Sequence, residues 1–186
     1  LHTPQARVMG VSEVLDDIRA AMPYISGITV SGGEATVQHE FVVELFSKIK
    51  QLPEFAHLTT FIDSNGNASE SIWESLAPFT DGVMLYLKAL DNASHIALTG
   101  SSNEVVLESI KFLDSIKKLF EVRLLLVPGH NDSDEELIKT AVWLKSVNPE
   151  MKIKINAFKT HGVRAAARDW SEVKEEDLLR YHSHLD

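Results

Sequence analysis

The stretch "GITVSGGEA", residues 27–35, carries the clearest structural signal in the chain. It begins as a short β-branched apolar run, which is typical of a buried strand, and ends in two glycines and a carboxylate. A strand that only packs into a core has no need of that ending. Glycine allows a close approach to the backbone at Gly32 and Gly33, and Glu34 adds a negative charge at the same point. The stretch therefore predicts a strand whose carboxyl end meets a cationic group.

Four further apolar runs follow, and amphipathic segments separate them. The five runs cover residues 27–31, 58–62, 83–87, 122–127 and 153–157. Near-continuous Val, Ile and Leu favour parallel strands that are covered on both faces. Three of these segments each show one apolar helical face. The first face has Phe41, Val42, Leu45, Phe46 and Ile49, the second has Val106, Ile110 and Leu113, and the third has Leu137, Ala141 and Leu144. Helices are also expected at 12–22 and 175–185, and Ser133 with Glu136 fits a capping box.

This alternation predicts an α/β fold built from repeated βαβ units, either a doubly wound sheet or a barrel. Because the chain starts on a helix and shows only five strands, we expect a partial (βα) barrel with its first unit missing. No linker or low-complexity tract interrupts the chain. Residues 1–186 are therefore expected to form a single domain.

Composition narrows the class of protein. The 186 residues carry 18 Lys+Arg against 27 Asp+Glu, a net charge of −9, which disfavours nucleic acid or an anionic membrane as the main partner. No apolar run approaches the roughly 20 residues of a spanning helix, and no signal peptide opens the chain, so a cytoplasmic location is expected. The chain has no cysteine and can hold neither a disulfide nor a thiolate-bound metal cluster.

Each predicted strand is followed by polar or glycine-rich residues. These are "GGE" (32–34), "DSNG" (63–66), Lys88, "PGHND" (128–132) and "KTHG" (159–162). Ligands of parallel α/β folds bind at the carboxyl ends of the strands. Five polar strand ends predict a shared pocket without identifying its ligand.

These segments carry a resemblance to a known family. "ITVSGGEA", "DSNG", "MLYLKA", "RLLLVPG" and "NAFKTHG" occur in the order and spacing of the radical S-adenosylmethionine enzymes that activate glycyl radical enzymes. The chain resembles the pyruvate formate-lyase activating enzymes over most of residues 10–170, and "SGGEAT" is similar to the YjjW-type branch. The resemblance implies a partial radical SAM barrel, S-adenosylmethionine and a [4Fe–4S] cluster. It also implies a 5′-deoxyadenosyl radical that abstracts hydrogen from a glycine of a partner enzyme, with a flavodoxin or ferredoxin as electron donor.

The resemblance also implies roles for individual residues. Gly32, Gly33 and Glu34 would hold the ammonium of the cofactor's methionine moiety, since an ammonium requires oxygen acceptors. Lys88 would contact the cofactor carboxylate or the ribose hydroxyls. The remaining implied positions are Asp63, Ser64 and the Met84 main chain around a monovalent cation, Asn65 beside the cofactor, Arg123 either inside the barrel or at the surface, and Val127 with Pro128 beside the adenine.

Several positions depart from the family pattern. Ala35 stands where the family has a proline, Tyr86 where it has an aspartate that would bind the cation, and Lys159 where it has a histidine. His161, two residues further on, is a candidate substitute for that histidine. The family also requires a C-x-x-x-C-x-x-C loop. That loop would lie upstream of Leu1, so the chain is expected to be the C-terminal part of such an enzyme and catalytically inert by itself. His182 and His184 are expected to be exposed.

Two other functions fit the same residues. The first is an aldolase-like barrel enzyme in which Lys88 forms a Schiff base, which borohydride trapping would detect. The second is a non-catalytic module that keeps the fold without the chemistry, and a three-cysteine loop upstream would exclude it.

Overall fold

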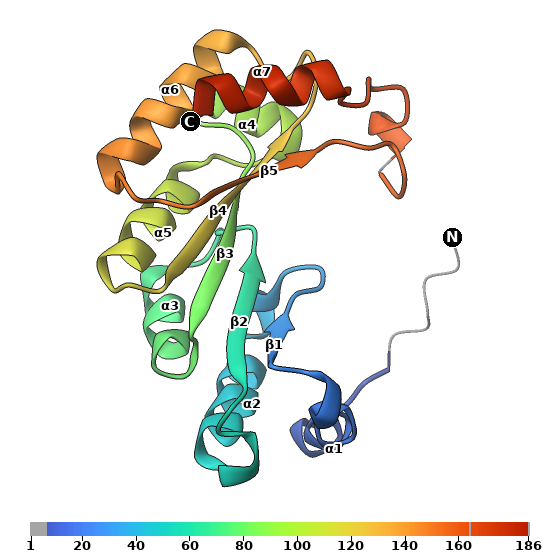
Figure 1. Cartoon of the computed structure of the whole chain (residues 1–186), viewed down its shortest axis with the longest axis vertical. Helices are drawn as coiled ribbons and strands as arrows, with labels where there is room; N and C mark the ends of the chain where they lie inside the picture. The colour runs from blue at the N-terminus through green and yellow to red at the C-terminus, as the bar shows by residue number, and fades with distance from the viewer. Residues whose placement is uncertain (1–6, 164, 186) are drawn as a thin grey trace.

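A computed structural model describes residues 7–163 and 165–185 and contains a five-stranded sheet (Figure 1). The strands are β1 (Gly27–Val30), β2 (Thr59–Ser64), β3 (Gly82–Leu87), β4 (Leu119–Leu126) and β5 (Ile153–Ala157). All four pairs are parallel, and the spatial order follows the sequence order. The predicted partial barrel of five parallel strands is confirmed. Two bounds differ by more than one residue, since β2 continues to Ser64 and β4 begins at Leu119.

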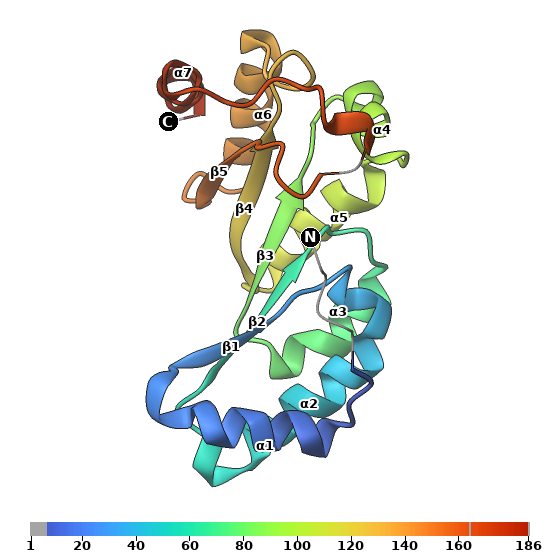
Figure 2. The same cartoon turned by 90° about the vertical axis from the view of Figure 1, so that its right-hand side faces the viewer.

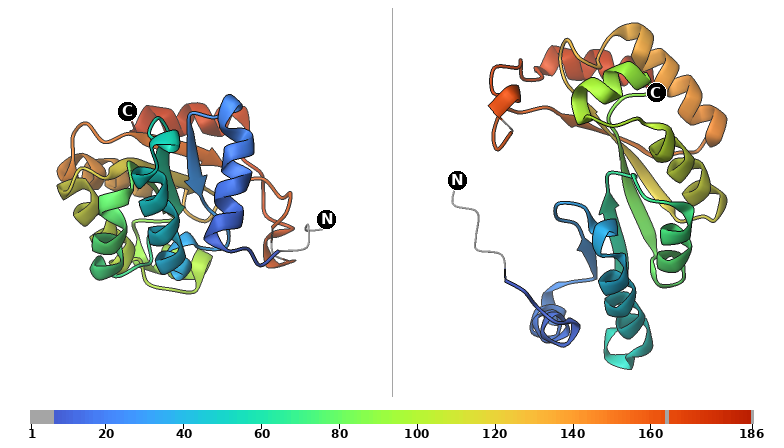
Figure 3. Two further views of the ribbon diagram at one scale, coloured as in Figure 1. Left: turned by 90° about the horizontal axis from the view of Figure 1, so that it is seen from below. Right: turned by 180° about the vertical axis from the view of Figure 1, so that it is seen from behind.

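Helices precede, separate and follow the strands. They are α1 (Val11–Ala21), α2 (His39–Gln51), α3 (Glu70–Leu76), α4 (Asn92–Thr99), α5 (Glu104–Ser115), α6 (Asp134–Val147) and α7 (Glu175–Leu185). Short 3₁₀ helices are η1 (Met22–Tyr24), η2 (Ala35–Gln38), η3 (Pro53–Phe55), η4 (Ala77–Phe79) and η5 (Ala165–Ala167). Figures 2 and 3 show α2, α3, α5 and α6 on the convex side, while the concave side is open.

The hydrophobic core lies between the sheet and these convex-side helices. The apolar helical faces expected from the sequence point into it. Phe46, Ile49 and Ile110 are fully buried, and Leu144 at the other end of the sheet is too. Burying side chains of this size stabilises a fold by about 1.5–3 kcal/mol each. This layer holds the strands in register, so that their carboxyl ends meet at one edge.

The expectation that both faces of the sheet are covered is wrong. Along β3, Val83, Leu85 and Leu87 are buried while Met84 and Tyr86 are only half-buried. Successive strand residues point to opposite faces, so this alternation means that helices cover one face only. The other face is the concave interior of the partial barrel, which carries polar and charged residues among its apolar ones.

Two local expectations have mixed outcomes. Ser133 caps α6 by accepting a hydrogen bond from the Glu136 amide at 3.3 Å, as predicted, while the Glu136 carboxylate contacts the Ser94 hydroxyl. His182 is exposed, but His184 is not fully so: its side chain is 25% exposed and its Nε2 lies 3.2 Å from Asp134. The docking of α7 against α6 accounts for this contact. Within residues 7–163 and 165–185, no helix combines the length and hydrophobicity that crossing a bilayer requires.

Candidate functional site

Glu34 links the carboxyl ends of β1 and β2. Its Oε1 accepts hydrogen bonds from the amide and hydroxyl of Thr36 (3.1 and 2.9 Å) and from the Ser64 hydroxyl (2.7 Å). Its Oε2 accepts one bond, from the Asn65 amide at 2.8 Å. A carboxylate oxygen offers about two lone-pair sites, so Oε1 is saturated while Oε2 can accept another donor. The charge of Glu34 is held at the strand ends with one oxygen partly free.

The two glycines before Glu34 line open space. Gly32 has φ +136°, a backbone conformation that side-chain-bearing residues rarely adopt. A Cβ placed at Gly32 or Gly33 would meet no heavy atom of the described protein within 4 Å. Crowding by neighbouring protein atoms therefore does not explain why glycine stands at either position. The uncrowded backbone leaves room for a bound molecule beside Glu34.

Arg123 crosses the concave face and joins three strands. Its Nη1 lies 3.1 Å from Oδ2 of Asp63, its Nε lies 2.6 Å from Oε1 of Glu121, and its Nη2 contacts the Met84 sulfur at 2.7 Å. Burial opposes the charge, but the hydrogen bond to Glu121 and the nearby Asp63 raise the pKa of Arg123 above its ordinary value. Of the two orientations expected for Arg123, the structure has the inward one, with the side chain 14% exposed.

Lys88 and Tyr86 extend this network toward the strand ends. The Lys88 ammonium lies 4.3 Å from the centre of the Tyr86 ring, and the Arg123 guanidinium lies 5.7 Å from it. The Tyr86 hydroxyl accepts a hydrogen bond from the Asn156 amide at 3.1 Å. Burial lowers the pKa of Lys88, and Asp63 partly offsets that effect. The aromatic ring therefore lies near both cations of the cluster.

A cavity of about 690 Å³ adjoins this cluster and brings predicted and unpredicted residues together. Lys88 and Asn65 line one part, and the other part lies between α4 and the segment 162–170. The further lining residues include Asn67, His95, Val106, Gly162, Val163 and Trp170. The expected shared pocket therefore has a counterpart beside the ends of β2 and β3. Glu34 and Arg123 are not among its lining residues.

Asn131 is a buried, hydrogen-bonded residue that sequence analysis named only as part of the segment 128–132. It is 3% exposed and donates to the main-chain oxygens of Lys88 (2.5 Å) and Leu125 (2.7 Å). Its Oδ1 accepts a bond from the Val127 amide at 2.7 Å. Asn131 thus fixes the carboxyl ends of β3 and β4 to each other. The segment "PGHND" contained the signal, but a turn asparagine is too common to identify this role.

The segment between β5 and α7 covers part of the cavity. Glu172 joins the two ends of this segment. It accepts hydrogen bonds from the Thr160 amide (2.9 Å) and hydroxyl (2.7 Å) and lies 3.2 Å from the Lys159 ammonium. The Thr160 bonds and Lys159 lower the pKa of Glu172 to about 2. Trp170 stacks on His130 with ring centres 4.0 Å apart. Lys159 therefore serves this closure, and His161 lies exposed in the same segment.

His95 is a buried lining residue of the cavity that sequence analysis did not predict. It is 4% exposed, and its Nδ1 lies 2.9 Å from the Ser101 main-chain oxygen. Because a carbonyl oxygen only accepts, Nδ1 must carry the proton, and Nε2 is then an acceptor in the neutral ring. An isolated histidine in a helical pattern gives no sequence signal for such a position.

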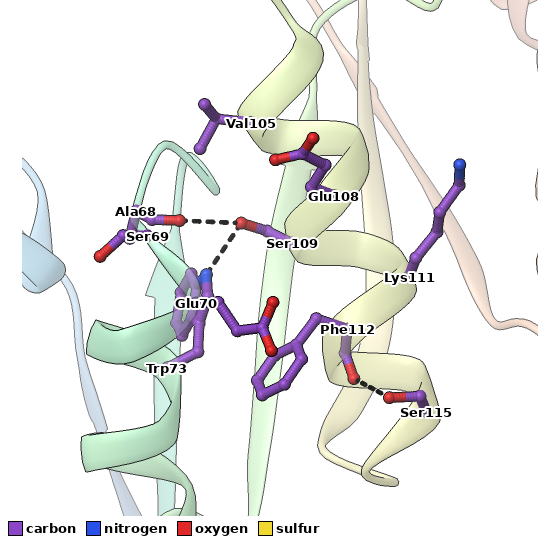
Figure 4. A pocket seen from close by; sticks show the side chains of 10 residues that line it. All are labelled: Ala68, Ser69, Glu70, Trp73, Val105, Glu108, Ser109, Lys111, Phe112 and Ser115. Carbon is purple, nitrogen blue, oxygen red and sulfur yellow. Dashed lines mark hydrogen bonds between the residues drawn. The ribbon is translucent and has the colours of Figure 1, made fainter.

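A larger cavity, of about 740 Å³, lies on the convex side between α3 and α5 (Figure 4). Trp73 donates to the Ser109 hydroxyl at 2.8 Å, and that hydroxyl lies 2.8 Å from the Gly66 oxygen and 3.2 Å from the Ala68 oxygen. These bonds join α5 to the β2–α3 connection. None of the predicted site residues lines this cavity, so the concave-side cluster and its adjoining cavity remain the candidate site.

Comparisons with known proteins show the family to which the sequence is related. Residues 2–141 match the radical SAM superfamily. The chain is 36% identical over 138 residues to the pyruvate formate-lyase-activating enzyme of Streptococcus mutans, covering 73% of this chain and 52% of that protein. It is 32% identical over 164 residues to the enzyme of the same name from Staphylococcus aureus, covering 85% and 65%. The chain thus spans about half to two thirds of the length of these relatives.

Solved structures share the fold. A crystal structure of a domain of pyruvate-formate lyase-activating enzyme from Bacteroides vulgatus superimposes with a TM-score of 0.70 at 20% identity, covering 87% of this chain and 93% of that one. Streptococcus suis SuiB bound to S-adenosylmethionine superimposes with a TM-score of 0.71 at 16% identity, covering 99% of this chain and 41% of that one.

Proposed function

The chain belongs to the radical SAM superfamily, and on that basis we propose that it binds S-adenosylmethionine as part of an enzyme that activates a glycyl radical enzyme. The strongest support for this proposal is sequence identity to a named relative. The chain is 36% identical to a pyruvate formate-lyase-activating enzyme over 138 residues. The partner enzyme is thus a glycyl radical enzyme, and the electron donor is a flavodoxin or ferredoxin.

Residues at the strand ends support the cofactor half of this proposal. Oε2 of Glu34 has acceptor capacity left, and the backbone at Gly32 and Gly33 is open, so an ammonium fits there without displacing protein atoms. Lys88 and Arg123 supply positive charge for the cofactor carboxylate. Both main-chain groups of Val127 are already bonded, to Asn131 and to the His130 amide, so Val127 contributes shape beside the adenine rather than hydrogen bonds.

The residues present do not fit a [4Fe–4S] cluster. The 186 residues include no cysteine, and the described part of the chain contains no group of three His, Asp or Glu residues that could hold a metal ion. Such clusters are held by thiolates. The proposed activity therefore requires cysteines from outside these residues, and no catalytic step is assigned to this chain alone.

The chain's own contribution is binding and orientation. When bound, S-adenosylmethionine would supply radical chemistry for removing hydrogen from a glycine of the partner enzyme. Glu34 holds the ammonium end, while Lys88 and Arg123 hold the carboxylate. The Schiff-base alternative requires a reactive Lys88, and its lowered pKa suits that chemistry. Family membership does not favour this alternative or a non-catalytic module.

A reconstitution experiment tests the proposal. The 186-residue chain and a fusion that adds a C-x-x-x-C-x-x-C loop ahead of Leu1 are each reconstituted anaerobically with iron and sulfide. We expect a cluster chromophore, and 5′-deoxyadenosine under reductant, from the fusion only. A fusion that assembles the cluster but binds no S-adenosylmethionine would refute the proposal. Turnover by the cysteine-free chain would contradict the thiolate requirement.

A further inference from the structure

We propose that Arg123 is a built-in cation: its guanidinium occupies the place at which the family resemblance puts a monovalent metal ion. The site then requires neither sodium nor potassium. The part that concerns the cofactor carboxylate rests on the proposed function, while the part that concerns metal binding does not.

The first support is that the only carboxylate of the implied ligand set is already paired. Oδ2 of Asp63 lies 3.1 Å from Nη1 of Arg123, and the Asp63 side chain is 17% exposed. The other oxygen, Oδ1, is buried and has no hydrogen-bond partner among the described residues. A metal ion at Oδ2 would have to displace Arg123, whereas Oδ1 is an oxygen of Asp63 that the described protein leaves unsatisfied.

The other two implied ligands offer little to a metal ion. Ser64 is 2% exposed, and its hydroxyl donates to Glu34 at 2.7 Å while accepting from the Gly66 amide at 3.0 Å. Met84 lies in β3, which pairs with a strand on each side, and its sulfur contacts the Arg123 guanidinium. The Met84 main chain pairs in register with Asp63 of β2, while the pairing of β3 with β4 shifts register between Val83 and Met84.

The third support is Tyr86, which stands where the family has a second carboxylate. Hard cations prefer charged or carbonyl oxygen, and a neutral phenol is a poor substitute. The Tyr86 hydroxyl is also bonded to Asn156, and its ring lies near the cations of Lys88 and Arg123. An aromatic face attracts such cations, so this residue suits organic cations and not a metal ion.

Charge balance leads to the same conclusion. Asp63 and Glu121 face Arg123, and Lys88 is the second cation close to Asp63. Two negative charges meet two positive ones where the Arg123, Asp63 and Glu121 side chains are only 14–17% exposed. A fifth charge is nearby, because Lys154 lies opposite Arg123 in the register of β4 and β5; its side chain is exposed to solvent. In the cofactor-free protein, a further metal ion would leave an uncompensated positive charge, which is costly in a poorly solvated place.

This arrangement gives Arg123 a positioning role. A guanidinium stays charged at any physiological pH and presents several donors in one plane. Held by Asp63 and Glu121, it places a permanent positive charge between the strands, next to Lys88. The cofactor carboxylate would meet this charge instead of a bound metal ion.

The test compares potassium, sodium and choline chloride at one ionic strength. The melting temperature of the 186-residue chain is measured without cofactor, and S-adenosylmethionine affinity is measured by titration calorimetry. For the natural sequence we expect melting temperatures within about 1 °C of one another and less than a twofold change in affinity. Saturable stabilisation by potassium or sodium, absent with choline, would overturn the proposal.

Two substitutions at Tyr86 sharpen the test. Tyr86→Asp restores the missing carboxylate and should make both readings depend on potassium or sodium, with affinity rising by about fivefold or more over choline. Tyr86→Phe keeps the ring and should stay indifferent to the salt. A Tyr86→Asp protein that ignores the metal ion as well would show that the ion has no place here, and would refute the idea that Arg123 occupies its site.

A third substitution addresses Arg123 directly. Arg123→Gln should weaken S-adenosylmethionine binding by about 10–100-fold in choline and recover part of it in potassium. This variant leaves two carboxylates unpaired and can therefore fail to fold. In that case the salt responses of the natural and Tyr86-substituted proteins decide the proposal. If no protein binds S-adenosylmethionine in any salt, the proposed function fails, while the cofactor-free melting temperatures still decide the role of Arg123.

Discussion

The Glu34 carboxylate, just past β1, accepts a hydrogen bond at 2.7 Å from the hydroxyl of Ser64, the last residue of β2. The same carboxylate caps η2 by accepting the Thr36 amide. Two strand ends and a helix start are therefore fixed around one negative charge. Such preorganisation means that the carboxylate needs little rearrangement to receive a cationic group.

Glu34→Gln should weaken S-adenosylmethionine binding more than it weakens the fold. The substitution removes the charge that pairs with the ammonium, a contact worth about 1.5–3 kcal/mol, or about 10–100-fold in affinity. Titration calorimetry measures the affinity, and urea unfolding measures the stability. Glu40→Gln, an exposed change on α2, is the control. Equal affinities for the natural and Glu34→Gln proteins would reject the role.

Lys88→Met should make the chain more stable and the cofactor bind less tightly. Burial lowers the pKa of Lys88, so its folded-state charge costs free energy that a thioether would not. A gain of about 1 kcal/mol would raise the melting temperature by about 2–4 °C. Because the pKa of Lys88 is lowered in the folded state, the natural protein should gain stability as the pH rises toward 10.5, the ordinary pKa. The Lys88→Met protein should lack this contribution to the pH dependence. A less stable Lys88→Met protein would show that the contact with Tyr86 outweighs burial.

Asn131→Ala should destabilise the fold by about 3 kcal/mol. The change leaves the Val127 amide and the Lys88 and Leu125 oxygens without their partner, and each unsatisfied buried group costs about 1–3 kcal/mol. Chemical denaturation measures the effect, with Asn67→Ala at an exposed position as the control. A loss below about 1 kcal/mol would mean that water replaces the amide.

Glu172 should make closure of the segment 160–172 depend on acid pH. Its pKa is lowered to about 2 from an ordinary 4.5, so its stabilising bonds are complete above about 4.5 and are lost as the pH falls toward 2. Proteolysis with pepsin across this range, read by mass spectrometry, should show increasing cleavage in the segment. Glu172→Gln should be cleaved there already near pH 4.5. Identical profiles for the two proteins would show that other contacts close the segment.

The sequence alone determined the order of the strands, the helical faces and the family. These depend on local apolar periodicity and on short motifs, and both are visible along the chain. The five apolar runs became five strands, and the faces that include Phe46 and Ile110 became the core. The polar strand ends were brought to one edge because parallel strands carry their carboxyl ends to the same side.

Only the tertiary structure decided which charges meet. Arg123 and Asp63 are 60 residues apart, and their pairing depends on the register of β2, β3 and β4. The same register placed Tyr86 beside Arg123. The chain sequence could not show this because long-range electrostatic pairs follow from packing and not from spacing. The buried amide of Asn131 joined two strand ends for the same physical reason.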